Sequence, residues 1–352
     1  SALNREVKAT RDSIGILDAS TLGKIDIQGR DVSEFLNRIY TNAWSKLEIG
    51  NCRYGVMLGD DGMVIDDGVT TRLGEYHYLM STTTGNAASV MSKLEDWLQT
   101  EWPELEVYLT SVTEQYGTIS LNGPNSRKLM KKLNPEYDFS KDNFPHMSFK
   151  NINLCGVECR VMRISFTGEL CYEINVPSGY AKYLWDICID KGKEYNITPY
   201  GTEAMHVLRA EKGFIIVGQE TDGSVTPVDL DMNWIVSKKK YDFIGKRALN
   251  RSDTIKKDRK QLVGLKTKDP KKVLEEGAQL VEAISALPMK MVGHVTSSYY
   301  SPNLNSSFAL ALIKGGLNKK GEKLFAPMED ETIEVEITNP VFIDPENKRV
   351  NQ

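Results

Sequence analysis

The chain has 352 residues, of which 40% are hydrophobic and 26% charged, and these fractions are ordinary for a globular protein with a large core. A formal net charge of −4 gives no overall attraction to nucleic acid or to an anionic membrane, so we expect neither as a partner and expect a small-molecule substrate. The five cysteines are an odd set without a second pair at zinc-ligand spacing, which predicts no metal site and a reducing, cytoplasmic location.

The first half of the chain alternates between helical and strand-like patterns. Asp31 can cap a short helix that ends near Ile39 and carries its apolar residues on one face. Similar apolar stripes predict further helices at 90–98, 129–133 and 180–188. Alternation of apolar and polar residues predicts strands at 24–28 and 160–164.

The second half changes character near residue 250. A helix capped by Thr202 ends at Gly213, and no further helical pattern follows after about residue 250. The stretch Arg251–Lys260 is rich in charge and poor in apolar residues, as a linker is. We therefore predict an α+β body of antiparallel sheets with helices over residues 1–252, followed by an all-β barrel domain over residues 258–352.

Two adjacent acids, Asp66 and Asp67, lie in the apolar stretch Met63–Val69. A strand would aim them at opposite faces, so that one can serve a site while the other faces water. The alternative, that Asp67-Gly68 is only turn chemistry, stays open, and Asp60-Asp61-Gly62 just upstream fits such a turn.

Common catalytic fingerprints are missing from the chain. There is no Gly-rich dinucleotide motif, no Walker loop and no Gly-x-Ser-x-Gly elbow. The four histidines are scattered without metal-ligand spacing, and the longest apolar runs, such as Phe308–Ile313, are too short to cross a bilayer. Redox or nucleotide chemistry is therefore not indicated by these residues.

Three further segments follow Val64–Asp67 along the chain, namely Phe166–Ile174, Lys212–Glu220 and Gly293–Pro302. In this order they resemble the tetrahydrofolate-dependent aminomethyltransferase family, which includes the T-protein of the glycine cleavage system. The resemblance covers nearly the whole chain. It implies the aminomethyltransferase fold, with a barrel domain at the C-terminus.

A closer resemblance is to the C-terminal half of the α subunits of heterotetrameric sarcosine oxidases, and the segments Ser20–Asp26, Tyr200–Gly213 and Val236–Lys240 carry it. Glu203 stands where T-proteins have arginine, and Phe166 stands where they have tyrosine, which argues against T-protein activity. Phe214 replaces the cysteine of a related non-enzymatic folate-binding group. The run Lys238–Lys240 is either a solvated face or the border of a subunit contact.

The resemblance also implies roles for individual side chains. Asp67 would be the catalytic residue, ionised at neutral pH with an ordinary pKa of about 3.9, and would hold a cationic iminium and accept a proton. Asp66, grouped with the folate-binding positions, would be the structural member that faces outward. Glu173 would accept the N–H groups of the pterin edge, and Tyr54 would cover one ring face.

Phe166 and Glu203 complete the folate-binding set that the resemblance implies. The expected reaction converts the imine of oxidised sarcosine and tetrahydrofolate into 5,10-methylenetetrahydrofolate and glycine. FAD, FMN and NAD are expected only in the full heterotetramer, with the oxidising flavin on a β subunit and a dinucleotide-binding half preceding this region. A stand-alone aminomethyltransferase or demethylase, or a folate-binding module without turnover, remains an alternative.

Overall fold

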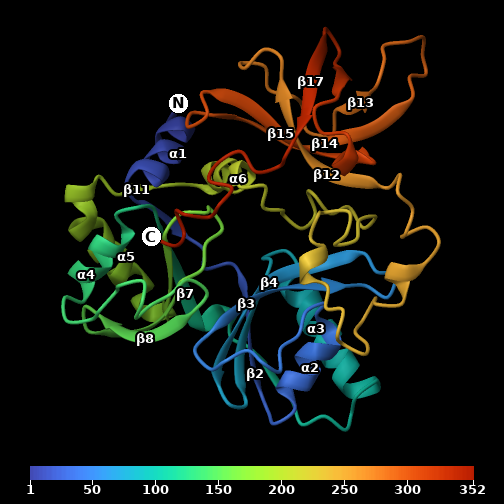
Figure 1. Cartoon of the computed structure of the whole chain (residues 1–352). Helices are drawn as coiled ribbons and strands as arrows, with labels where there is room; N and C mark the ends of the chain where they lie inside the picture. Colours follow the sequence, from blue (N-terminus) through green and yellow to red (C-terminus); the bar gives the residue numbers. More distant parts are fainter.

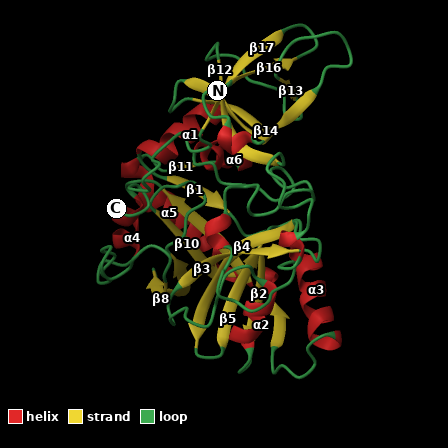
Figure 2. Ribbon diagram, turned by 45° about the vertical axis from the view of Figure 1, so that its right-hand side comes forward, coloured by secondary structure: helices red, strands yellow, loops and turns green.

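The computed structural model describes all 352 residues, Ser1–Gln352. The chain forms two open sheets and one closed barrel, which Figure 1 shows as three lobes. Four of the six α-helices cover the two sheets, and the other two lie next to the barrel, as the turned view in Figure 2 shows. This arrangement confirms the predicted α+β body with a C-terminal barrel.

The five-stranded sheet carries two helices on one face, α2 (Val32–Ile39) and α3 (Ala87–Thr100). Its strands, in spatial order, are β3 (Cys52–Leu58), β4 (Val64–Gly74), β5 (His77–Thr82), β2 (Gly23–Gln28) and β6 (Tyr108–Ser111). Apolar residues of the strands, such as Ile25 and Met57, form one core with the helices. The amphipathic pattern at 31–39 therefore predicts α2 correctly, although Asp31 accepts from Glu106 N instead of capping the helix.

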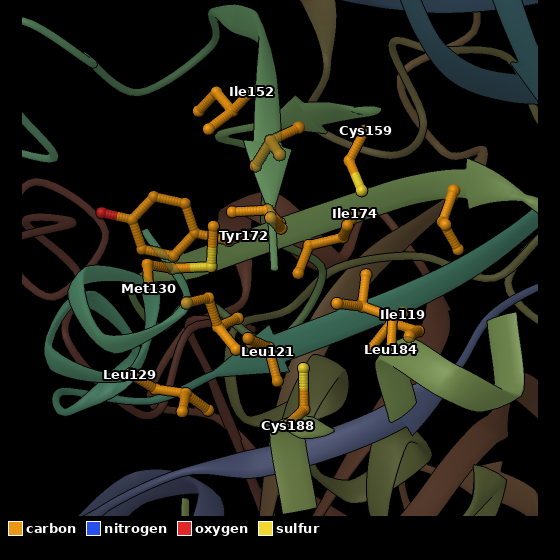
Figure 3. Close-up of a cluster of buried hydrophobic side chains, with 14 of the residues drawn as sticks. Ile119, Leu121, Leu129, Met130, Ile152, Cys159, Tyr172, Ile174, Leu184 and Cys188 are labelled. Atoms are coloured by element: carbon orange, nitrogen blue, oxygen red, sulfur yellow. The ribbon is translucent and has the colours of Figure 1, made fainter. Parts of the chain in front are cut away.

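The six-stranded sheet is covered on one face by α4 (Ser126–Leu133) and α5 (Ala181–Gly192). Its strands, in spatial order, are β11 (Thr198–Pro199), β1 (Gly15–Asp18), β7 (Tyr116–Asn122), β10 (Cys171–Pro177), β9 (Val157–Met162) and β8 (Phe149–Leu154). Tyr172 and Ile174 of β10 point into the core between strands and helices, together with Cys188 of α5 (Figure 3). The odd-numbered residues of β10 therefore face the other way, toward the five-stranded sheet.

A smaller cluster joins the two sheets across their inner faces. It combines Leu79 of the five-stranded sheet with Met162 of the six-stranded sheet, and Val69 packs against it. Helices α1 (Ala2–Asp12) and α6 (Thr202–Glu211) contact each other and share a core with the β3–β4 hairpin and the barrel. The inner faces of the two sheets are therefore in contact through this cluster.

The barrel is closed by six antiparallel strands. In spatial order they are β12 (Lys260–Thr267), β15 (Ser306–Lys314), β14 (Met291–Ser301), β13 (Gln279–Val281), β16 (Lys323–Pro327) and β17 (Thr332–Thr338). Short 3₁₀ helices connect elements at Thr113–Gln115, Ser178–Tyr180, Lys193–Tyr195, Asn233–Ile235, Ala248–Asn250 and Gly316–Asn318. As predicted, no α-helix follows residue 250, and none of the helices has the length and apolar character needed to traverse a membrane.

The last residues leave the barrel and return to the body. Phe342 N donates to Glu211 O, and Arg349 Nε lies 2.7 Å from Glu169 Oε1. Glu169 also pairs with Arg11, and both of these side chains are buried. The C-terminus therefore lies beside the lobe of α4 and α5, as Figure 1 shows.

Candidate functional site

The β3–β4 hairpin sets the directions of the acid pair. The register pairs Val56 with Asp67 and Met57 with Asp66, and directly paired residues share a face. Val56 belongs to the core that includes α6, whereas Met57 belongs to the core under α2 and α3. The two acids therefore point to opposite faces, as the strand interpretation predicts.

The turn interpretation holds for one Asp-Gly step and fails for the other. Gly62 has φ of +84° and lies in the turn between β3 and β4. Gly68 lies within β4, where a Cβ atom would meet Ser81 O at 2.0 Å. Gly68 is thus required by the close approach of the neighbouring strand and not by a turn.

Asp66 does not face water, and that part of the prediction is wrong. Its exposed fraction is 1%, because α3 covers this face of the sheet. Asp66 Oδ1 accepts from Thr83 Oγ1 at 2.7 Å and from Asn86 Nδ2 at 3.2 Å, next to the start of α3. Burial raises the pKa of Asp66 to about 6, although the hydrogen bonds from Thr83 and Asn86 oppose the rise.

Asp67 lies on the inner face and is half-buried. The phenol of Tyr54 donates a 2.5 Å hydrogen bond to Asp67 Oδ2, which leaves Oδ1 free to accept. Burial raises the pKa of Asp67 to about 7, opposed by the Tyr54 hydrogen bond and reinforced by the Asp66 charge. The expectation of an ordinary pKa is therefore wrong, and Asp67 can both take up and release a proton near neutral pH.

Glu173 occupies the inner face of the opposite sheet. It is half-buried, and its carboxylate has neither a hydrogen-bond partner nor an ion pair. Burial raises its pKa to about 7, and the nearby Lys24 ammonium opposes the rise. A carboxylate in this state is available to N–H donors of a ligand.

Glu173 lines a cavity of about 10 Å³ between the two sheets, whereas Asp67 does not line it. Val69 contributes to its wall, and Val69 stands two residues from Asp67 on the same side of β4, roughly 7 Å away. This volume holds about one water molecule. The cavity as it stands is therefore too small for a pterin ring.

Lys24, which also lines this cavity, is a site residue that sequence reasoning missed. Its exposed fraction is 3%, and its Nζ donates to Ser20 O at 3.0 Å and to Leu22 O at 2.9 Å. The signal was present in the strand pattern, because Ile25 and Ile27 face the helices and Lys24 must therefore face the other sheet.

Phe166 and Glu203 lie apart from the acid pair. The Phe166 ring stacks on Phe214 with centroids 6.3 Å apart, and 39% of Phe166 is exposed. Glu203 is exposed on the first turn of α6. Neither residue contacts Asp67 through a hydrogen bond or ring contact, so their folate-binding roles stay predictions.

This fold, with two inner-face carboxylates and a C-terminal barrel, matches one family over most of the chain. Residues 1–240 match the model described as GCVT N-terminal domain, and residues 260–344 match the one described as glycine cleavage T-protein C-terminal barrel domain. The chain therefore belongs to the glycine cleavage T-protein family.

Within this family, the chain is similar to two curated sarcosine oxidase α subunits. It is 53% identical to that of Corynebacterium sp. (strain U-96) and 41% identical to that of Rhizobium meliloti (strain 1021), each over 99% of this chain. The chain spans 36% of the length of each of these relatives. The resemblance inferred from the sequence is thereby confirmed.

A solved structure of the glycine cleavage system aminomethyltransferase T from Bartonella henselae has the same fold. It superposes with a TM-score of 0.84 over 97% of this chain and 90% of that chain, at 23% sequence identity.

Proposed function

We propose that this chain carries out folate-dependent one-carbon transfer. The carbon comes from the imine of oxidised sarcosine, and the products are 5,10-methylenetetrahydrofolate and glycine. Membership of the glycine cleavage T-protein family and similarity to sarcosine oxidase α subunits support this proposal. Within this chain, the observation that carries it is the pairing of Tyr54 with an inner-face Asp67 whose pKa is about 7.

One side chain of this chain, the Glu173 carboxylate, has the chemistry needed to bind a reduced folate. The Glu173 carboxylate faces the space between the sheets without a partner, and the pterin edge offers adjacent N–H donors that such a carboxylate can accept. Tetrahydrofolate supplies two N–H groups whose nitrogens become bonded to the transferred carbon, while their hydrogens end on the glycine nitrogen.

Asp67 would handle the protons of this transfer. Its Oδ1 is the free acceptor, because Oδ2 is held by Tyr54. With a pKa of about 7, Asp67 can accept a proton from an amine and then return it to the departing glycine nitrogen. Asp66, which is buried under α3, takes no part in this step.

The test uses the full chain, tetrahydrofolate and an imine generated by a separate amine-oxidising enzyme. We expect Asp67→Asn to slow formation of methylenetetrahydrofolate by about 10²- to 10⁴-fold, the usual contribution of a positioned general base. Asp60→Asn is the control, because Asp60 is exposed in the turn of the same hairpin. An unchanged rate in Asp67→Asn would remove Asp67 from the mechanism.

Folate binding is tested separately from turnover. We expect Glu173→Ala to weaken tetrahydrofolate binding by about 10- to 100-fold, because hydrogen bonds to a charged acceptor are lost. Calorimetry with Glu136→Ala, an exposed glutamate, provides the control. Tight binding without any imine-dependent turnover would favour the alternative of a folate-binding module.

We also propose that the imine is formed elsewhere. A flavin-bearing partner subunit would oxidise sarcosine, and FAD, FMN and NAD would belong to that larger assembly. The chain alone would then show no oxidase activity. The five free cysteines suit a reducing, cytoplasmic location.

A further inference from the structure

The lysine run singled out in the sequence is divided by the structure. Lys238 and Lys239 are exposed, as a solvated face would be, but Lys240 is half-buried. Its Nζ donates to the carbonyls of Tyr40 and Asn42, just beyond the C-terminal end of α2. Lys240 is therefore held against the main chain, unlike the two exposed lysines before it.

Lys240 lies on a groove of about 690 Å³ formed by α2 and the segment Lys240–Arg247, together with Asp60 and Trp102. Figure 1 shows the chain after α6 running beside the sheet that carries α2 and α3. The volume falls within the range of small-molecule sites, which is roughly 300–1,000 Å³. The groove lies on the helix-covered side of this sheet, whereas Asp67 lies on the inner side.

Two cations in the groove lack a carboxylate partner. Lys240 donates only to main-chain carbonyls, and so does Lys246, whose Nζ bonds to Tyr241 O at 2.7 Å and to Lys240 O. The other cations are matched, since Arg38 pairs with Glu34 at 3.0 Å and Arg247 lies 3.7 Å from Asp242. Neither lysine therefore forms an ion pair, although the carboxylates of Glu34, Asp60 and Asp242 also line the groove.

A purely structural role does not account for all the hydrogen-bond donors of these two ammonium groups. A lysine near a helix C-terminus is stabilising, and Lys240 satisfies that description. Each ammonium has three N–H donors, however, and each uses two on carbonyls, which leaves one donor per lysine. Burial lowers the pKa of Lys240 to about 7, opposed by the Glu34 charge and reinforced by the Lys246 charge.

An aromatic ring stands between the two lysines in sequence. Tyr241 lines the groove and is 97% exposed, with no hydrogen bond from its hydroxyl. Phe243, in contrast, is buried and lies under both ammonium groups, 4.8 Å from Lys240 Nζ and 6.0 Å from Lys246 Nζ. A free planar ring and two lysines without ion pairs on the same groove are suited to a ligand that combines a ring with an anion.

We propose that this groove binds a phosphate monoester attached to a planar ring, as in a mononucleotide. The free donors of Lys240 and Lys246 hold the phosphate, and Tyr241 stacks on the ring. This proposal is independent of the folate chemistry, because none of the groove residues belongs to the folate-binding set.

The test measures binding to the full chain by calorimetry, with inorganic phosphate, adenosine and adenosine monophosphate as probes. We expect adenosine monophosphate to bind most tightly. Lys240→Met and Lys246→Met should each lower its affinity by about tenfold or more, as expected for loss of a charge-assisted hydrogen bond. Lys239→Met is the matched control, since Lys239 belongs to the same run but lies outside the groove.

A second variant separates ligand binding from folding. Tyr241→Ala changes a fully exposed side chain, so it leaves the fold intact, and it should weaken adenosine monophosphate binding but not phosphate binding. Thermal melts confirm that the lysine variants are folded. Absence of saturable binding of adenosine monophosphate overturns the proposal, and so does equal affinity in Lys239→Met, Lys240→Met and Lys246→Met.

Discussion

Tyr54 and Asp67 are diagonal neighbours on the inner face of the β3–β4 hairpin, joined by a 2.5 Å hydrogen bond from the phenol to Oδ2. The register pairs Tyr54 with Val69 and Asp67 with Val56, so the bond crosses between adjacent pairs. It fixes the carboxyl group and favours its ionised form against the effect of burial. Tyr54 thereby lowers the pKa of Asp67, in addition to any contact that Tyr54 makes with a ligand.

We predict that Tyr54→Phe moves the pH dependence of one-carbon transfer upward. A general base must be ionised, and loss of a hydrogen bond to the carboxylate raises its pKa. The rising limb of the rate, with a midpoint near pH 7 in the unaltered chain, should shift by about one pH unit. The rate is measured from pH 6 to 9, with the exposed Tyr108→Phe as the control. A lower rate at every pH with an unmoved midpoint would contradict this role.

Lys24 should affect folate binding through Glu173. Its ammonium favours the ionised carboxylate, so Lys24→Met raises the pKa of Glu173 and leaves more of it protonated at pH 7. We predict that tetrahydrofolate affinity falls by roughly tenfold at pH 7 and recovers toward the unaltered value at pH 9. Calorimetry at both pH values measures this, and a loss that is equal at pH 7 and pH 9 would indicate a purely structural role.

The raised pKa values of Asp66, Asp67 and Glu173 also predict how stability depends on pH. Asp66, Asp67 and Glu173 hold their protons more tightly in the folded chain than in the unfolded chain, with folded pKa values of about 6, 7 and 7. The folded state therefore binds more protons above pH 4, so these groups make the free energy of unfolding decrease as pH rises from about 4 to 7.

Glu173→Gln should remove the contribution of Glu173 to this pH-dependent loss of unfolding free energy. We predict that the variant, compared with the unaltered chain, gains about 1–3 kcal/mol in unfolding free energy at pH 8 and nothing at pH 4. Urea unfolding at the two pH values measures the difference. A gain of the same size at both pH values would show that the effect is packing and not ionisation.

The sequence predicted the directions of Asp66 and Asp67 because strand alternation is a local property. It could not predict that α3 covers Asp66, since that depends on how a helix 20 residues later packs on the sheet. The raised pKa of Glu173 also depends on tertiary packing and not on local sequence, because Glu173 and Lys24 lie close together only when the two separate sheets face each other. The raised pKa of Asp67 is therefore a property of the assembled core.

The predicted division of the chain at residues 252–258 can be tested by brief trypsin digestion. Arg251, Lys256 and Lys257 are exposed in a stretch without helix or strand, so we expect a first cut there. The two fragments should nevertheless elute together under native conditions. The core that α6 shares with the barrel holds them together. The segment after β17 adds to this, because Phe342 bonds to the main chain of α6 and Arg349 contacts buried Glu169 at 2.7 Å.

Arg349→Met tests that explanation. Arg349 Nη2 also donates to Arg11 O at 2.9 Å, so the substitution removes two contacts between the C-terminal segment and the body and leaves Glu169 with one cation instead of two. We predict that the nicked variant dissociates at a lower urea concentration than the nicked unaltered chain, as measured by size-exclusion chromatography. First cleavage within the barrel strands would contradict the predicted division. Separation of the unaltered fragments without denaturant would contradict the bridging role of the C-terminal segment.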